Sequence, residues 1–310
     1  MSKFNPFDYF FILRPLILIP SWNFLLIGAY LSLRKSGLTY NIILGIVIYT
    51  CVMGGIYILN QIMDIETDKI NRKLFLLSGG YIQIRWAYSE MILLWILAII
   101  LSFTFGSIFL FFIVLSLVLG ILYSVPPVKL KGKPLADTLA HGIGYGLVNF
   151  SIGWLLVSRF EWPMFIAFLP YVLSISGVFI NTTIVDIEGD KKANEVTTAV
   201  FLGEKLSYIV STILMTSAIV TAVILKDLIC LLPAAISLPL FIYAAVYSLT
   251  KNKIHRRITI ASFRLPGLIF TLITGLLYPP YLLVLIIIVV GMRIYYKTRF
   301  GMTYPTLANG

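Results

Sequence analysis

Ten apolar runs follow one another along this chain of 310 residues, and each is about as long as a helix that crosses a lipid bilayer. They cover residues 10–33, 39–63, 85–104, 107–124, 136–158, 163–185, 206–225, 228–249, 259–278 and 280–298. A bilayer core about 30 Å thick is crossed by roughly 20 helical residues. Only 12% of the residues are charged, which excludes a water-soluble globule. We therefore predict an all-α, polytopic membrane helical bundle.

The last two runs are separated only by Pro279 and Pro280. Residues 10–278 hold nine runs, which we expect to form the core of the bundle, and residues 280–298 hold an extra C-terminal helix. The last two runs could instead form one bent hairpin. No stretch between the runs is long enough for a soluble domain, so we expect residues 1–310 to form a single integral-membrane domain.

The basic residues indicate how the bundle is oriented. If the N-terminus is cytoplasmic and all ten runs cross the bilayer, 20 of the 24 lysines and arginines lie on the cytoplasmic side. The other four are Arg34, Lys35, Arg159 and Lys226. The positive-inside rule predicts such a split. It also accounts for the net charge of +11 without a nucleic acid, and we predict neither a nucleic acid nor a protein partner.

One acidic motif occurs twice in the chain. D-I-E-T-D-K at 64–69 returns as D-I-E-G-D-K at 186–191, which is 122 residues later, and each copy follows an even-numbered apolar run. Such a repeat predicts two pseudo-repeated halves that face each other across a central cavity. Both motifs are then expected at the cytoplasmic end of the bundle.

The motif carries oxygen ligands at helical spacing. Asn60, Asp64 and Asp68 share one helix face if the helix continues past Asp64, and Asp186 and Asp190 repeat the spacing. Oxygen ligands suit Mg²⁺, which takes its other ligands from water and phosphate oxygens, so the motifs predict a phosphorylated substrate. The alternative is a pair of solvated helix ends that pair with nearby lysines. Two copies in so apolar a chain favour the metal site.

A lysine loop follows the fourth run, with the sequence Y-S-V-P-P-V-K-L-K-G-K at 123–133. The two prolines stiffen the turn, and Lys129 and Lys131 emerge on the same side as the acidic motifs. They could hold phosphate oxygens, or they could be ordinary positive-inside charge, which is the better account of Lys133. Tyr123, the first residue of this segment, is the aromatic residue next to the lysines that we single out.

Two further groups of residues have both a functional and a structural interpretation. His141, at the start of the fifth run, could accept a proton, but a lone histidine is more often a hydrogen-bonded packing residue. Asn149, Asn181 and Thr182 lie within apolar runs, where they could line a cavity or bond a neighbouring helix.

Taken together, these motifs resemble the UbiA superfamily of intramembrane prenyltransferases. The resemblance rests on N-x3-D-x3-D at 60–68, the Y-S-x-P-P-x-K-x-K loop, D-x3-D at 186–190 and G-E-K at 203–205, and it covers residues 10–278 in order and spacing. The chain departs from the usual pattern at Gln61, where the family mostly has Asp. It also has N-R-K-L-F-L at 71–76 in place of a proline-rich segment.

The resemblance implies a function and a site. It implies an Mg²⁺-dependent enzyme that joins a polyprenyl group from a diphosphate donor to a lipophilic acceptor in the bilayer and releases pyrophosphate. Two Mg²⁺ would be held by Asn60, Asp64, Asp68, Asp186 and Asp190. The diphosphate would bind Lys129, Lys131, Arg72 and Asn60, and the acceptor would lie near Arg14 and His141. The four aspartates and Tyr123 are the expected catalytic residues.

Two other functions remain open from the sequence. A terpene cyclase on the same scaffold would use the same motifs, but the allylic cation would be attacked by the chain's own double bonds. A secondary transporter would explain the repeat and the number of helices. Transporters usually place ionisable groups near the midplane of the bilayer, whereas these acids are expected at one face.

Overall fold

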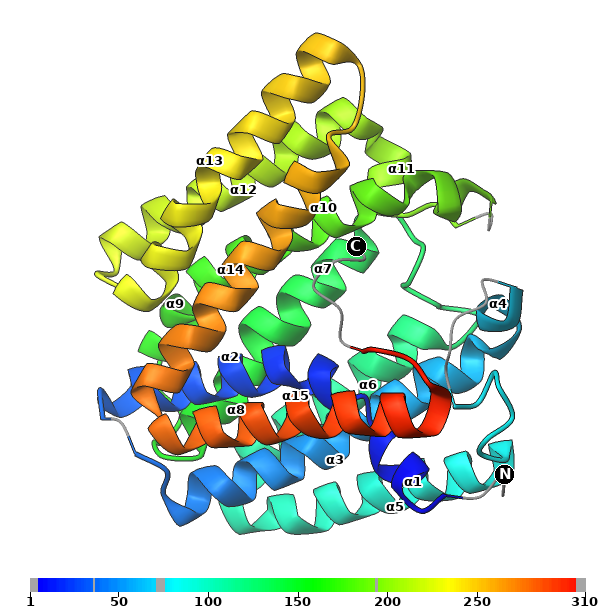
Figure 1. Cartoon of the computed structure of the whole chain (residues 1–310). Helices are drawn as coiled ribbons and strands as arrows, with labels where there is room; N and C mark the ends of the chain where they lie inside the picture. The colour runs from blue at the N-terminus through cyan, green and yellow to red at the C-terminus, as the bar shows by residue number, and fades with distance from the viewer. Residues whose placement is uncertain (1–4, 36, 71–75, 193–194, 305–310) are drawn as a thin grey trace.

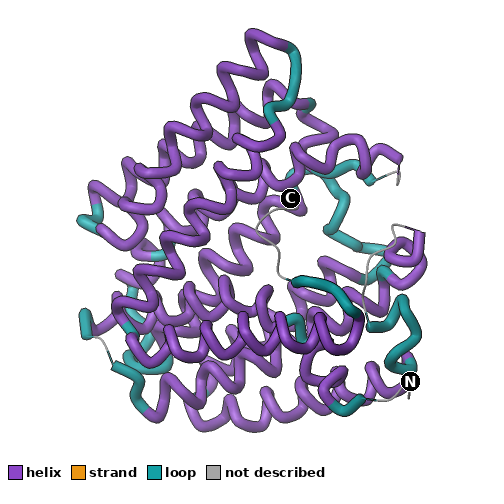
Figure 2. Tube along the Cα trace, in the orientation of Figure 1, coloured by secondary structure: helices purple, strands orange, loops and turns teal. Residues whose placement is uncertain are grey.

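The structure, a computed structural model, describes residues 5–35, 37–70, 76–192 and 195–304. Every regular element among these residues is a helix (Figure 2). The helices are α1 (Phe7–Phe11), α2 (Pro15–Leu33), α3 (Tyr40–Met63), α4 (Ile65–Ile70), α5 (Ile84–Ser102), η1 (Phe103–Phe105), α6 (Ser107–Ser124), α7 (Ala136–His141), η2 (Gly142–Asn149), α8 (Phe150–Leu155), α9 (Pro163–Ala167), α10 (Leu169–Lys192), α11 (Thr198–Leu202), α12 (Glu204–Ile224), α13 (Leu228–Lys251), α14 (Arg256–Leu277) and α15 (Pro279–Phe300).

The expected membrane bundle is confirmed. Within the described ranges, nine helical stretches are long and apolar enough to cross a bilayer, among them the 22 residues of α15. The remaining expected run, 136–158, is also helical: α7, η2 and α8 follow one another without a break, and η2 is a π-helical stretch of 8 residues. The sequence pattern therefore placed all ten helices.

The repeat extends from the two motifs to whole helices. Adding 122 to the bounds of α2, α3, α5 and α6 gives 137–155, 162–185, 206–224 and 229–246. These ranges nearly coincide with α7 to α8, α9 to α10, α12 and α13. The chain is thus built from two halves of four helices each, and α14 and α15 lie outside the repeat.

The two halves meet where α2 crosses α8 (Figure 1). A Cβ atom on Gly28 would lie 2.0 Å from the carbonyl oxygen of Phe150, and one on Gly153 would lie 1.8 Å from that of Leu25. Both glycines are therefore required for the close approach of the two backbones. Small residues at such crossings allow the packing contacts that hold helices together in lipid.

The first helix is broken at Arg14, which corrects the expectation of one helix over residues 10–33. α1 ends at Phe11, α2 begins at Pro15, and Arg14 has φ 55° and ψ 61°. The cause is Pro15, whose ring disfavours the helical conformation of the residue before it. Arg14 consequently lies in a bend rather than on a helix.

The C-terminal helix α15 packs beside α1 and α2 (Figure 1). The hydroxyl group of Tyr281 donates to Asn23 Oδ1 at 2.9 Å. Asp8, which is 1% exposed, accepts from the Tyr295 hydroxyl at 2.6 Å and pairs with Arg299 at 2.9 Å. A buried carboxylate needs such partners, so these contacts fix the extra helix against the start of the chain.

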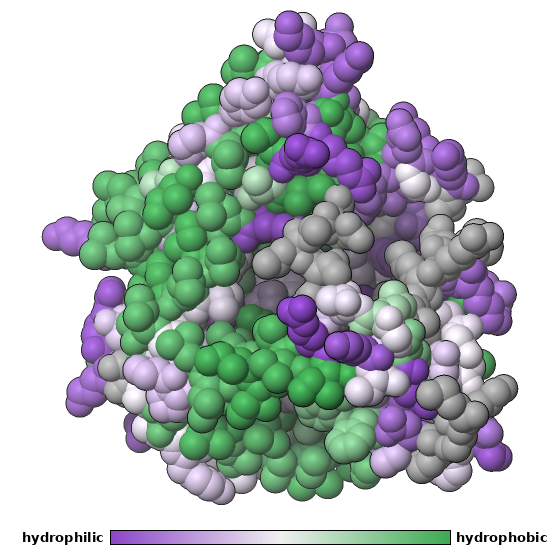
Figure 3. Space-filling model, viewed as in Figure 1, coloured by the Kyte–Doolittle hydropathy of each residue, from purple (hydrophilic) through white to green (hydrophobic). Residues whose placement is uncertain are grey.

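The surface of the bundle is apolar where lipid is expected. Figure 3 shows hydrophobic residues over α14 and α15 and hydrophilic residues mostly at the ends of the helices. On α14, Leu272 and Leu276 are exposed, whereas Thr259, Ser262 and Thr274 are fully buried. Lipid satisfies leucine side chains but not hydroxyl groups, so this arrangement fits a helix that faces the bilayer.

Candidate functional site

A cavity of about 250 Å³ lies between α2, α3, α6 and the helical stretch 136–155. Six residues that the sequence singled out line it: Arg14, Asn60, Tyr123, Lys131, His141 and Asn149. They come from four separate segments of the chain, so the fold gathers at one cavity residues that are far apart in the sequence.

The cavity runs along one face of α3, from Asn60 near the acidic motif to Tyr49, about 16 Å further along the helix axis. At its inner end the Tyr49 hydroxyl group donates to Asn149 Oδ1 and lies 3.2 Å from Ser116 Oγ. Asn149 therefore both lines a cavity and bonds a neighbouring helix. The sequence did not indicate Tyr49 or Ser116, because one tyrosine or serine in an apolar run carries no pattern.

The first aspartate motif keeps its helical spacing. Asp64 N donates to Asn60 O at 3.0 Å and Asp68 N donates to Asp64 O at 2.8 Å, although Asp64 itself separates α3 from α4. The shared face predicted for these three residues is thus supported by the backbone. The side chain of Asp64 is 15% exposed, and Asp68 is buried at 5%.

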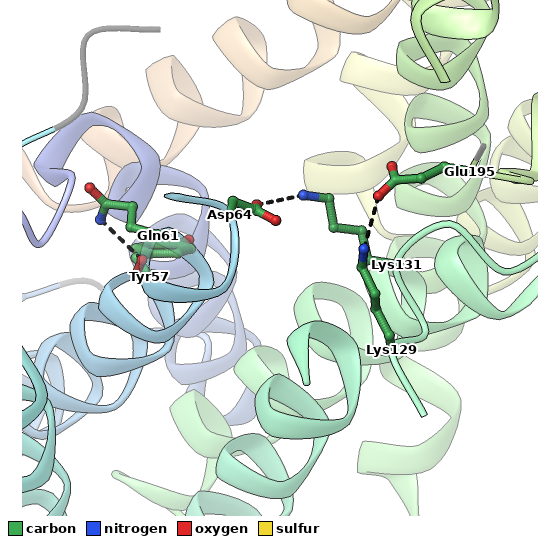
Figure 4. Close-up of polar contacts among 6 residues, drawn as sticks. All are labelled: Tyr57, Gln61, Asp64, Lys129, Lys131 and Glu195. Atoms are coloured by element: carbon green, nitrogen blue, oxygen red, sulfur yellow. Dashed lines mark hydrogen bonds and ion pairs between the residues drawn. The ribbon is translucent and has the colours of Figure 1, made fainter. Parts of the chain in front are cut away.

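The lysine loop contacts the first aspartate motif and the segment that follows the second (Figure 4). Lys131 Nζ lies 2.6 Å from Asp64 Oδ2, and Lys129 Nζ lies 3.1 Å from Glu195 Oε1. Lys129 has φ 34°, in the left-handed region that non-glycine residues rarely adopt, and strained backbone of this kind is concentrated at functional sites. The two lysines therefore point in different directions, one toward each half of the repeat.

The segment after the second motif docks on the same loop. Glu195 N donates to Asp190 O at 2.9 Å, and Thr197 Oγ1 donates to Asp190 Oδ2 at 2.9 Å. Val196 N donates to Gly132 O of the lysine loop at 3.1 Å. Both aspartate motifs thus lie at the end of the bundle that carries α4 and α11, at the right of Figure 1.

A buried carboxylate holds this arrangement together. Asp137 Oδ2 accepts from Thr198 N at 2.9 Å, and Asp137 Oδ1 accepts from Thr138 N at 2.6 Å and from the Thr198 hydroxyl group. Asp137 is 1% exposed. Asp137 was not among the residues predicted from the sequence, although an acidic residue just inside an apolar run is a usable signal.

We expect the Asp137→Ala substitution to destabilise the fold by about 2–4 kcal/mol, since it leaves buried N–H and O–H donors without an acceptor. The measurement is the unfolding midpoint in detergent, which should fall by several degrees. Glu188→Ala removes an exposed acid from the end of α10 and should leave the midpoint unchanged. Equal midpoints for the two variants would contradict a structural role for Asp137.

His141 is held on three sides. Its Nδ1 atom lies 3.0 Å from Asp137 O, its ring stacks on Phe179 with centroids 3.7 Å apart, and the Tyr123 ring meets it edge-on at 5.1 Å. These contacts agree with the packing interpretation, while His141 also lines the cavity. Tyr123 and His141 therefore form one aromatic wall.

The oxygen donors at this end fit Mg²⁺. Among the residues that the structure describes, no three His, Cys, Asp or Glu side chains lie together in a group that could hold a metal ion. Mg²⁺ does not require such a cage, because it is usually bound by one or two carboxylates together with water and substrate phosphate oxygens. Arg72, expected to bind the diphosphate, lies outside the described residues.

Comparison with known proteins identifies relatives of this arrangement. The family model for the UbiA prenyltransferase family matches residues 21–265. The probable homogentisate phytyltransferase 2 of Oryza sativa subsp. japonica is 31% identical over 174 residues, which are 54% of this chain and 46% of that protein. The digeranylgeranylglyceryl phosphate synthase of Sulfurisphaera tokodaii is 30% identical over 187 residues, which are 59% of this chain and 65% of the relative. The chain thus matches about half to two thirds of the length of these curated relatives.

Solved structures share the fold over nearly their whole length. A structure concerned with digeranylgeranylglyceryl phosphate synthase matches with a TM-score of 0.68 and 25% identity, covering 88% of this chain and 97% of that one. A UbiA homologue from Archaeoglobus fulgidus, bound to GPP and Mg²⁺, matches with a TM-score of 0.67 and 17% identity, covering 87% of this chain and 99% of that one. At 17% identity the second match supports the fold alone.

Proposed function

Because the chain belongs to the UbiA prenyltransferase family, we propose that it transfers a polyprenyl group from an isoprenyl diphosphate to a lipophilic acceptor and releases pyrophosphate. The observation that carries the proposal is the lysine loop at the cavity mouth, which contacts Asp64 on one side and the segment after Asp190 on the other. Cations and carboxylates gathered at one face fit a diphosphate site better than the mid-membrane site of a transporter.

The residues of this end have complementary roles in the proposal. Asn60, Asp64, Asp68, Asp186 and Asp190 would hold Mg²⁺, which we take to be two ions. Bound Mg²⁺ supplies Lewis-acid stabilisation of the negative charge on the departing diphosphate. Lys129 and Lys131 add hydrogen bonds from ammonium groups to the remaining phosphate oxygens, and Arg72 is proposed to join them.

Bond breaking then follows from charge stabilisation at the cavity mouth. The allylic carbon–oxygen bond breaks with its electron pair leaving on the diphosphate. A nucleophilic atom of the acceptor forms the new bond to that carbon and loses a proton. The walls suit the cation, because the rings of Tyr123 and Tyr145 offer π-electrons and the apolar side chains delay capture by water. Arg14 and His141, on the same cavity, are proposed to face the acceptor.

The location follows from the same arrangement. We propose that residues 1–310 form one multi-pass membrane domain and that the aspartate motifs and the N-terminus face the cytoplasm. Lys129, Lys131, Lys191 and Lys192 lie at the motif end, as the positive-inside rule requires of a cytoplasmic end.

The test is an assay of the purified protein with labelled geranylgeranyl diphosphate and Mg²⁺. Homogentisate and a glycerol-phosphate ether lipid serve as trial acceptors, with shorter and longer donors beside them. We expect a joined product and one pyrophosphate per transfer by mass spectrometry. A cyclic hydrocarbon without acceptor would instead identify a terpene cyclase. Failure to consume a donor of any length would contradict both enzymatic functions.

A further inference from the structure

We propose that Glu195 is a built-in competitor for the diphosphate at Lys129, so that the Lys129–Glu195 pair opens when the donor binds and closes again when pyrophosphate leaves. This inference rests on the proposed function. It adds a residue that none of the aspartate and lysine motifs contains, and it concerns product release rather than bond breaking.

The pair is built into the fold rather than formed by two loose surface side chains. Glu195 precedes a segment that is fixed to the lysine loop by the bond from Val196 N to Gly132 O and to Asp137 by Thr198 N. The Glu195 side chain lies flat on Gly132, since a Cβ atom there would be 3.1 Å from Glu195 Cβ and 3.4 Å from Glu195 Cδ. Gly132 has φ 76°, which glycine adopts without strain.

The chemistry of the pair matches that of the proposed ligand. An ammonium group donates hydrogen bonds to a carboxylate oxygen or a phosphate oxygen with similar geometry, so Glu195 Oε1, at 3.1 Å from Lys129 Nζ, takes the place of a phosphate oxygen. The side chains are 39% and 22% exposed, so the pair is reachable from solvent and can exchange partners.

The two lysines differ in what happens to their partners. Asp64, the partner of Lys131, belongs to the proposed metal site and would become a ligand of Mg²⁺ when the metal and the diphosphate bind. Glu195, the partner of Lys129, belongs to no such site, and no other described cation pairs with it. Diphosphate binding therefore displaces Glu195, and the displaced carboxylate favours the return to the empty state.

The experiment compares two glutamine substitutions by their binding of inorganic pyrophosphate. Glu195→Gln keeps the shape of the side chain and removes its charge. Glu66→Gln is the matched control, because Glu66 is an exposed acid on α4 at the same end and pairs with Lys69 instead. Titration calorimetry in detergent with Mg²⁺ gives Kd for each variant and the wild type.

We expect Glu195→Gln to lower Kd by about threefold to tenfold. A site that is open only part of the time has an apparent Kd equal to its intrinsic Kd divided by the open fraction, and the substitution raises that fraction. Glu66→Gln should change Kd by less than about twofold, because its side chain is 83% exposed and dissolved salt screens its charge. In a Lys129→Met background, Glu195→Gln should have no effect. Tighter pyrophosphate binding should also slow release and lower the steady-state rate relative to the first turnover.

Several results would overturn the inference. An unchanged or raised Kd in Glu195→Gln, with Glu195→Ala giving the same result and both variants melting like the wild type, would contradict the competition. So would an equal effect of Glu66→Gln, or an effect that persists without Lys129. If the wild type failed to bind pyrophosphate at all, the proposed function itself would be wrong; if it bound pyrophosphate but the variants did not differ, only the role of Glu195 would be.

Discussion

Replacing Asp186 by asparagine is expected to lower kcat by about a thousandfold while the protein keeps its unfolding midpoint. Asp186 is exposed at the motif end of α10, and within the described residues no bond to its side chain supports the fold. Its proposed role is to bind Mg²⁺ through a negatively charged carboxylate, and the neutral amide of asparagine lacks that charge. Losing one charge-stabilising contact in the transition state typically costs two to three orders of magnitude.

Asp64→Asn should lower kcat to a similar extent, with a second consequence that Asp186→Asn lacks. It also breaks the 2.6 Å pair with Lys131, so some loss of stability should accompany the loss of activity. The measurements are initial rates with labelled donor and the unfolding midpoint of each variant in detergent.

Glu188→Gln is the control for both substitutions. Glu188 lies two residues from Asp186 on the same helix, and this spacing directs its side chain away from the face that Asp186 and Asp190 share. It should retain nearly normal activity. If both aspartate variants turned over substrate as fast as Glu188→Gln, the aspartate motifs would not hold a catalytic metal.

The helices could be predicted because the bilayer imposes a length and a composition on every crossing. The motifs could be predicted because carboxylates are costly in such a chain, so a repeated cluster stands out from its surroundings. The repeat offset of 122 residues, read from two hexapeptides, also relates the observed helices of one half to those of the other. In each case the signal was contained in a stretch of contiguous sequence.

The cavity walls and the partners of the lysines could not be predicted, because they depend on which helices meet. Tyr49, Ser116 and Asn149 belong to three different helical stretches, and no pattern links them before the fold brings them together. The partner of Lys129 is Glu195, 66 residues further along the chain. The bend at Arg14 differs from these features, because the proline after it is a local signal that the expectation of one helix over residues 10–33 overlooked.

Removal of Mg²⁺ is expected to have the second large effect, raising the Kd for pyrophosphate by at least about a hundredfold. The reason is the balance of charge among the residues assigned to the site. Without the metal, the four aspartates assigned to it and the neighbouring Glu195 oppose the anion, against Lys129, Lys131 and Arg72. Each of these lysines already pairs with a carboxylate, Glu195 in one case and Asp64 in the other. A site of this net charge repels pyrophosphate.

The same charge balance separates the metal's contribution from that of the lysines. Calorimetry in excess chelator measures the contribution of the metal, and calorimetry of Lys131→Met in saturating Mg²⁺ measures that of a lysine. Lys131→Met should weaken binding by only about tenfold, because one ammonium contact is lost while the metals remain. Raising the salt concentration should weaken the residual binding in chelator further, since it then depends on partly exposed charges. If Kd were unchanged in chelator, the lysines alone would hold the diphosphate. The aspartates repel an anion unless a cation lies between them and it, so they would then have no role in binding the diphosphate.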